Sequence, residues 1–181
     1  MFEIKSKIVE KLLGYYFINP HARHYINELA RFLDVDPANL YKQLKRMEAE
    51  GMFVSEIQGN LKYFSLNMKY PLLGEFKKTY NLKYGVEQKI VQALVGLKGL
   101  KEAYIFGSYA KNSFGAESDI DILLVGKHSS IEARRSLSKI EKEIMRELNV
   151  IDMTEQEFAE RKKKKDEFVE NILKNKIIKL I

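Results

Sequence analysis

The chain has 181 residues, which is long enough for one large domain or two small ones. It contains no cysteine, and this excludes disulfides, thiolate metal sites and a cysteine nucleophile. The net charge of +6 is spread along the chain, so no part is a polycationic tail and any nucleic-acid contact must come from a local patch. The absence of a signal-like or membrane-spanning apolar run predicts a cytoplasmic protein without a membrane partner.

Three helices are predicted in the first 50 residues. Apolar residues at helical spacing predict the first over residues 3–17 and the second over about 25–33. Asp36 is a good N-cap and the proline after it suits the first helical position, which predicts a third helix over 37–50, ended by Gly51. Two short helices joined by a tight turn form a helix-turn-helix.

The third helix is expected to bury Leu40, Leu44 and Met47. The residues left at its surface are of types that contact phosphates and base edges: Asn39, Tyr41, Lys42, Lys45 and Arg46. The alternative is a solvated face on which Glu48 and Glu50 balance the charge.

A hairpin is predicted next, because residues 52–57 and 61–66 alternate around the turn residues 58–60. Helix-turn-helix plus hairpin, with segments 28–36 and 44–51, resembles the winged-helix domains of bacterial and archaeal regulators. The resemblance implies duplex DNA as a partner, bound by the surface residues of the third helix and by Lys62 in the wing. Many winged helices instead mediate protein contacts, so that alternative stays open.

Beyond a partly helical connector, the chain alternates helices and strands. Helices are predicted over 86–97 and 132–148, strands over 103–106 and 149–153, a helix capped by Thr154, and a last strand within 176–181. The basic run 162–165 is interpreted as a solvated helix face because acids bracket it. His21, His24 and His128 lack metal-ligand spacing and are predicted as surface or turn residues.

Residues 104–126 carry the chemistry. They are predicted to form a buried strand, a Gly-Ser turn into a short helix, and a second strand that opens with two carboxylates. Alternation along that strand places Asp119 and Asp121 on one face, with Ile120 and Ile122 toward the core. Two adjacent carboxylates repel each other unless a cation lies between them, and Mg²⁺ or Mn²⁺ suits their oxygen ligands.

A phosphate site is predicted opposite these carboxylates. Gly107 allows the backbone to approach a ligand, and the amides of Ser108 and Tyr109 at a helix start suit a phosphate. A phosphate cradle facing a metal-binding pair suggests nucleotidyl transfer.

Gly-Ser, a short spacer and Asp-x-Asp resemble the minimal nucleotidyltransferases of the DNA polymerase β superfamily over residues 86–181. The resemblance implies that Asp119 and Asp121 are catalytic and bind Mg²⁺, which bridges the phosphates of a nucleoside triphosphate. It also implies that Gly107 and Ser108 hold the outgoing phosphates, while Lys111 neutralises charge nearby. Minimal nucleotidyltransferases often work beside a small helical partner in toxin–antitoxin pairs, so such a partner is implied by resemblance only.

Two parts of the family pattern are changed. Lys111 and Asn112 stand where relatives often carry Arg-Gly. The third carboxylate expected on the neighbouring strand is replaced: alignment through the following Thr-x-x-Glu-Phe places Asn149 there. Asp152, three residues further on, is expected to point to the opposite face. Since an asparagine oxygen is neutral, we expect only one metal ion to be well held.

The sequence therefore predicts an α+β protein with a winged helix-turn-helix domain over 1–69, a connector over 70–85, and a nucleotidyltransferase-like domain with a small mixed sheet over 86–181. One functional hypothesis is an enzyme that transfers a nucleoside monophosphate to a protein or small molecule. The other is a DNA-binding regulator or antitoxin-like protein whose nucleotidyltransferase fold is weakly active or inactive. The acceptor, the nucleotide, the DNA target and the oligomeric state, including a homodimer, stay open.

Overall fold

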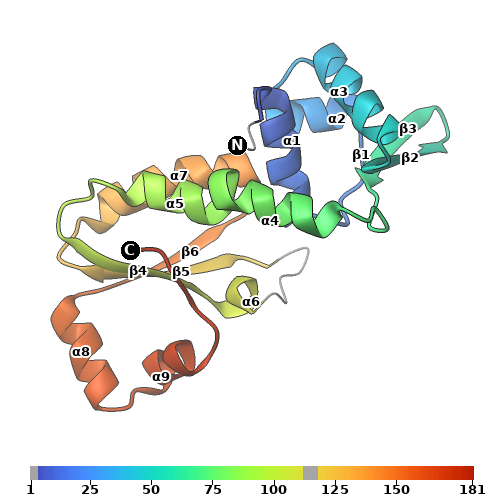
Figure 1. The fold of residues 1–181 in the computed structure, drawn as a ribbon. Coiled ribbons are helices and arrows are strands. Elements are labelled where there is room, and N and C mark those ends of the chain that lie inside the picture. Colours follow the sequence, from blue (N-terminus) through green and yellow to red (C-terminus); the bar gives the residue numbers. More distant parts are fainter. Residues whose placement is uncertain (1–3, 112–117) are drawn as a thin grey trace. The chain divides into compact units, whose positions relative to one another are not determined.

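The computed structural model describes residues 4–111 and 118–181, which divide into two compact units (Figure 1). The first runs to Gln88 and includes Glu143–Met145, and the second takes Lys89–Lys142 and Arg146–Ile181. Asn112, one of the two departures noted above, lies outside the described residues. No helix of the described residues is long and apolar enough to cross a membrane.

The first unit contains most of the predicted N-terminal elements. They are α1 (Lys7–Ile18), β1 (His24–Tyr25), α2 (Ile26–Leu33), α3 (Pro37–Ala49), β2 (Phe53–Gln58), β3 (Leu61–Leu66) and α4 (Leu73–Tyr84). The Asp36 side chain accepts a hydrogen bond from the Asn39 amide at 2.8 Å, so the predicted cap of α3 is confirmed. The predicted hairpin is confirmed as well, with Gly59 at a positive φ of 59° in its turn.

The three strands of this unit form an antiparallel sheet in the order β1-β3-β2. Tyr16 of α1 is fully buried against it, and its hydroxyl donates to the Phe64 carbonyl of β3 at 2.9 Å. The Tyr16 ring also meets Phe53 of β2 edge-on, with centroids 5.0 Å apart. One aromatic side chain thus connects a helix to two strands.

Helix α4 differs from the partly helical connector that the sequence predicts, because it is continuous over Leu73–Tyr84. Its only fully buried side chain is Tyr80, which packs edge-on against Phe17 at 5.2 Å and donates to the Glu10 carbonyl at 3.0 Å. A helix held mainly by one aromatic anchor has a sparse apolar pattern, and this explains why periodicity predicted it weakly.

The second unit contains the remaining elements. After α5 (Val86–Leu94), which begins in the first unit, they are β4 (Leu100–Phe106), α6 (Gly107–Ala110), β5 (Ile120–Gly126), α7 (Ser130–Ile144), β6 (Leu148–Met153), α8 (Glu155–Lys163), α9 (Glu167–Lys174) and β7 (Ile178–Lys179). The sheet order is β6-β5-β4-β7, with β5 and β6 parallel and the other pairs antiparallel. The predicted small mixed sheet is confirmed.

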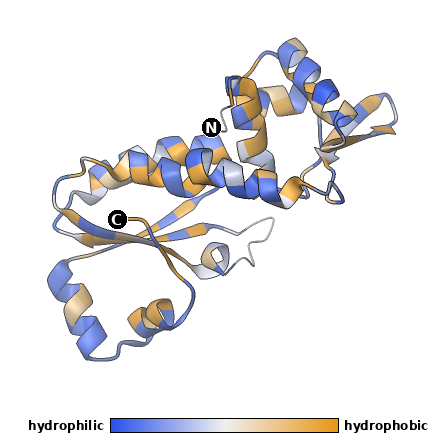
Figure 2. Ribbon diagram, viewed as in Figure 1, coloured by the Kyte–Doolittle hydropathy of each residue, from blue (hydrophilic) through white to orange (hydrophobic). Residues whose placement is uncertain are grey.

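The central strand β5 is buried over nearly its whole length and is among the most hydrophobic segments of the unit (Figure 2). On one face Leu123 and Val125 pack with Phe158 of α8 and with Val169 and Ile172 of α9. Ile120, Ile122 and Leu124 alternate to the other face and are also fully buried. A strand covered on both faces is apolar along most of its length, and Asp121 is the polar residue that interrupts this one.

Candidate functional site

The two carboxylates lie where three strands place their ends together. Asp121 is the second residue of β5, and it pairs with Phe106, the last residue of β4, and with Asn149, the second residue of β6. Asp119 is exposed and comes just before the strand. Helix α6 follows β4 directly, so the Gly-Ser turn stands beside the start of β5 (Figure 1).

Gly107 and Asp121 fit together so closely that a side chain at Gly107 is excluded. The glycine has a φ of 71°, and a Cβ atom added to it would lie 2.1 Å from Oδ2 of Asp121. The sequence predicts that this glycine allows a ligand to approach the backbone. The structure adds a second reason for it, which is that the carboxylate needs the space.

The other two residues predicted to bind phosphates lie within one helical turn of Gly107. Ser108 is the second residue of α6 and is half-buried, and the exposed Lys111 follows the helix. The Lys111 amide donates to the Gly107 carbonyl at 3.2 Å, which closes this turn. The Lys111 side chain makes no ion pair with another described residue. Its ammonium group is therefore available to an anion.

Asn149 occupies the place that sequence alignment predicted. Its Nδ2 donates to Oδ1 of Asp121 at 3.0 Å across the parallel β5–β6 pair. Because the Asn149 amide is neutral, it leaves the negative charge of Asp121 in place, which a lysine would neutralise. It also adds no negative charge to attract a metal ion, as an aspartate at the same position would.

Asp152 points away from this group, as alternation along β6 predicted. It stands opposite Leu124 in the register, and its Oδ1 lies 2.7 Å from Nε2 of His128. His128 lies in the loop between β5 and α7, which agrees with the prediction of a turn residue, but its side chain is only 1% exposed. The imidazole can be buried because the Asp152 carboxylate, 24 residues further along the chain, hydrogen-bonds to it.

The donor set suits one hard divalent cation. The carboxylates of Asp119 and Asp121 are oxygen ligands of the kind that Mg²⁺ and Mn²⁺ take, with phosphate oxygens and water completing the shell. Asn149 turns its Nδ2 rather than its carbonyl oxygen toward Asp121. Nowhere in residues 4–111 and 118–181 do three or more His, Cys, Asp or Glu side chains gather as a metal site. Asp119 and Asp121 therefore fit one divalent cation that also binds a phosphate ligand. The described residues beside them do not supply the carboxylates for a second cation.

The first unit carries a second candidate surface, which we call the α3 face: Asn39, Tyr41, Lys42, Lys45 and Arg46 of α3, with Lys62 of β3. The five residues of α3 are exposed, as predicted, and Lys62 is half-buried. Most of its cations already have acidic partners. Lys45 and Lys62 both reach Glu48, and Arg46 Nε lies 3.6 Å from Glu50 Oε1.

Glu48 lies beside the α3 face and does more than balance the charge of its cations. Its carboxylate accepts from Lys45 Nζ at 2.7 Å, from the Ser55 hydroxyl, and from Lys62 Nζ at 3.4 Å. The Lys45 ammonium, then the Ser55 hydroxyl and Lys62, lower the pKa of Glu48 to about 2. Helical spacing indicates only the Lys45 contact, because Ser55 and Lys62 come from β2 and β3.

Comparison with known proteins assigns the family. The nucleotidyltransferase domain family matches residues 87–179, which is more than half of the chain. The chain therefore belongs to the nucleotidyltransferase domain family. No curated protein matches the chain significantly.

Three solved structures are similar over part of the chain. A toxin–antitoxin with AMP-PNP is 26% identical over 36% of this chain and 56% of its own, with a TM-score of 0.33. A mutant of the toxin–antitoxin MntA-HpeT is 17% identical over 52% and 72%, with a TM-score of 0.39. A candidate nucleotidyltransferase from Sulfolobus solfataricus is 26% identical over 41% and 68%, with a TM-score of 0.29. This chain thus spans little more than half the length of the first of these structures. The assignment to the nucleotidyltransferase domain family rests on the family match alone.

Proposed function

We propose that the nucleotidyltransferase domain binds a nucleoside triphosphate with Mg²⁺ or Mn²⁺ and transfers the nucleoside monophosphate to a hydroxyl group of a protein or small molecule. The observation that carries this proposal is the close fit of Gly107 and Asp121 where β4 ends and β5 begins. That fit places a Gly-Ser turn directly beside a carboxylate, which is the pairing that nucleotidyl transfer needs.

Each residue of the site has a defined part in this reaction. Asp119 and Asp121 hold the cation, which when bound neutralises charge on the phosphates. Gly107 and Ser108 orient the β- and γ-phosphates, and Lys111 offers its ammonium group to them. The acceptor oxygen forms a bond to the α-phosphorus, the α–β phosphoanhydride bond breaks, pyrophosphate leaves, and the hydroxyl proton passes to solvent water.

Transfer in this protein is proposed to be slow. Asn149 presents an amide to Asp121 where relatives place a third carboxylate, and Asp152 is held by His128 on the other face. Without moving, neither residue can accept the proton of the attacking hydroxyl. Neither can hold a second cation beside that hydroxyl. The arrangement favours a protein that binds metal-nucleotide well and turns it over rarely.

Changing both aspartates tests the binding step. Asp119→Asn with Asp121→Asn is expected to lower the affinity for ATP with Mg²⁺ by at least about tenfold, the change that 1.4 kcal/mol produces. Calorimetry of each nucleoside triphosphate, with Mg²⁺ and with EDTA, measures it. Glu132→Gln with Glu160→Gln makes the same charge change at two exposed positions of the same unit and should leave the affinity unchanged. Equal nucleotide binding by wild type and the double asparagine variant, with or without metal, would refute a metal-bridged site.

For the first unit we propose a winged helix that binds duplex DNA through the α3 face and the β2–β3 hairpin. Two helices ending in a capped α3, followed by a hairpin with Lys62 on its second strand, support this. We place this domain at residues 1–69, the connector at 70–85 and the nucleotidyltransferase domain at 86–181. The winged helix would then bring the transferase, or a partner bound to it, to a chromosomal site.

Removing two exposed cations tests DNA binding. Lys42→Ala with Arg46→Ala is expected to weaken retention of genomic duplexes and to reduce the slope of log K against log salt by about 1.8, or 0.9 for each lost phosphate contact. Filter binding or fluorescence anisotropy over a salt series measures both. Lys69→Ala with Lys78→Ala is the control, because both are exposed cations of the same unit outside the α3 face. Unchanged retention by the α3 variant, or no retention by wild type at low salt, would refute the proposal.

A further inference from the structure

We propose that Glu48 is a built-in counter-ion, which occupies the position of a DNA phosphate between Lys45 and Lys62 and lowers the affinity of the α3 face for duplex DNA. This inference rests on the proposed DNA binding. It also corrects the simplest picture of that surface, in which every lysine contributes equally to phosphate contacts.

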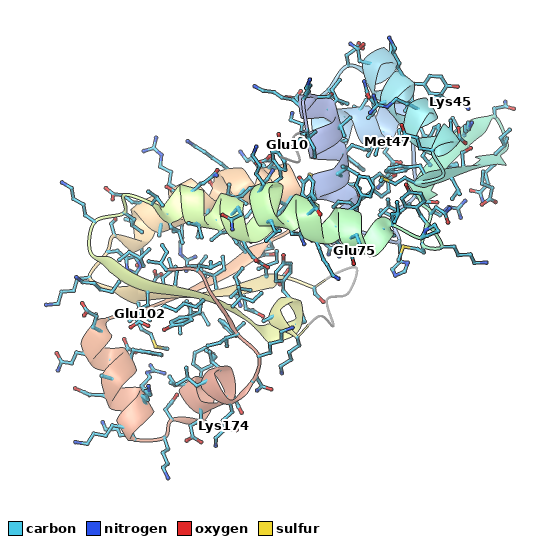
Figure 3. All side chains as sticks on the ribbon, in the orientation of Figure 1. Glu10, Lys45, Met47, Glu75, Glu102 and Lys174 are labelled. Carbon is cyan, nitrogen blue, oxygen red and sulfur yellow. The ribbon has the colours of Figure 1, made fainter. Side chains whose placement is uncertain are left out.

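The geometry around Glu48 is that of an occupied anion site. Lys45, labelled in Figure 3, lies three residues before it on α3. Lys62 and Ser55 come from the two strands of the hairpin. Lys62 Nζ is 3.4 Å from both carboxylate oxygens, and it also lies 5.2 Å from the centre of the Phe64 ring. Two ammonium groups and a hydroxyl from three elements thus converge on one carboxylate, as they would on a phosphate group.

Glu48 differs from the other acids of this surface in how firmly it is held. The Arg46–Glu50 pair is 64% and 56% exposed, and such exposed pairs exchange readily for other partners. The Glu48 side chain is only 20% exposed and has three donors. Because its pKa is near 2, it stays ionised wherever DNA binding is measured.

An ionised Glu48 affects two lysines at once. A phosphate that approaches Lys45 or Lys62 meets a carboxylate of the same sign at hydrogen-bond distance from both, so part of the attraction is cancelled. Lys42 makes no ion pair with another described residue. Phosphate contacts in the wild type are therefore expected mainly from Lys42 and from Arg46, whose partner exchanges easily.

Removing the charge at Glu48 is expected to release both lysines to DNA. Glu48→Gln should raise the affinity for a genomic duplex about tenfold at low salt and steepen the slope of log K against log salt by up to about 1.8, the value for two added phosphate contacts. Anisotropy with one labelled duplex over a salt series measures the affinity and the slope together. Thermal melting of each variant shows whether it is folded.

Three variants separate this effect from net charge and from packing. Glu75→Gln makes the same charge change at an exposed glutamate paired with Lys78, and should alter affinity by less than about twofold. Glu48→Asp keeps the charge and should show no gain. If Glu48→Gln fails to fold, Ser55→Ala removes one donor that holds the carboxylate, and it should raise affinity by a smaller factor with a steeper salt slope.

The outcomes also separate this inference from the proposed function. If wild type binds duplex DNA and Glu48→Gln matches Glu75→Gln, the counter-ion inference is wrong and DNA binding stands. If Glu48→Gln binds more weakly than wild type, Glu48 contacts DNA directly, for example a cytosine amino group, and the inference is again wrong. If no variant retains any duplex, both the inference and the proposed DNA binding fall.

Discussion

Asn149→Asp is expected to raise nucleotidyl transfer by at least about tenfold, since a charged ligand beside Asp121 needs to contribute only 1.4 kcal/mol to the transition state to do so. The amide of Asn149 already lies 3.0 Å from Oδ1 of Asp121, so the new carboxylate falls beside the existing one without a change of backbone. Mass analysis of acceptor proteins after incubation with each nucleoside triphosphate and Mg²⁺ measures the transfer.

A second readout of this variant does not depend on finding the acceptor. Without metal, two carboxylates on paired residues repel each other and should lower the melting temperature. Mg²⁺ should restore it, so the gain in melting temperature on adding Mg²⁺ should be larger for Asn149→Asp than for wild type. An equal gain in both would show that the carboxylate does not face the cation.

Asp152→Asn is the matched control, because it changes the other acidic candidate of the same strand. It should leave transfer unchanged, while stability falls because the buried His128 loses its charged partner. Robust transfer by wild type that Asp152→Asn abolishes would overturn the assignment of Asn149 and restore Asp152 as the third catalytic carboxylate.

Gly107→Ala is expected to abolish detectable nucleotide binding. The added Cβ would lie 2.1 Å from Oδ2 of Asp121, so either the carboxylate or the turn must move. The positive φ of 71° adds strain of about 1–2 kcal/mol for an alanine. We expect the free energy of unfolding to fall by about 1–3 kcal/mol in total, measured by denaturant titration beside calorimetry with ATP and Mg²⁺.

The control for Gly107→Ala is Gly74→Ala in α4. Nothing lies within 4 Å of a Cβ placed at Gly74, so the same substitution there should be neutral or slightly stabilising through helix propensity. If Gly107→Ala bound nucleotide as tightly as wild type, the close fit of the Gly-Ser turn and Asp121 would have no functional meaning.

Features that depend on neighbouring residues were predictable from the sequence. The cap at Asp36, the turn at Gly59 and the strand that carries Asp121 each follow from residues a few positions apart. The position of Asn149 was predicted through the Thr-x-x-Glu-Phe that follows it, and the register of the parallel β5–β6 pair places it opposite Asp121.

Features that depend on distant residues were not predictable. The burial of His128 requires Asp152, the network at Glu48 requires Ser55 and Lys62, and the conformation of Gly107 matters because of Asp121. The sequence around His128 and Glu48 gives no sign of these partners, and at Gly107 the motif predicts proximity to Asp121 but not how closely the two residues fit. Functional meaning at these positions comes from contacts, which periodicity and spacing do not encode.

The anchoring of α4 has a consequence for how the protein is made. Tyr80 and Tyr84 bond to backbone atoms of Glu10 and Ile4, across sequence separations of 70 and 80 residues. While the ribosome is still translating the hairpin, α1 therefore lacks the aromatic side chain that covers Phe17. We therefore expect the N-terminal unit to close only after residue 84 has left the exit tunnel, and a nascent chain that stalls between the hairpin and α4 to expose this apolar surface to chaperones and proteases.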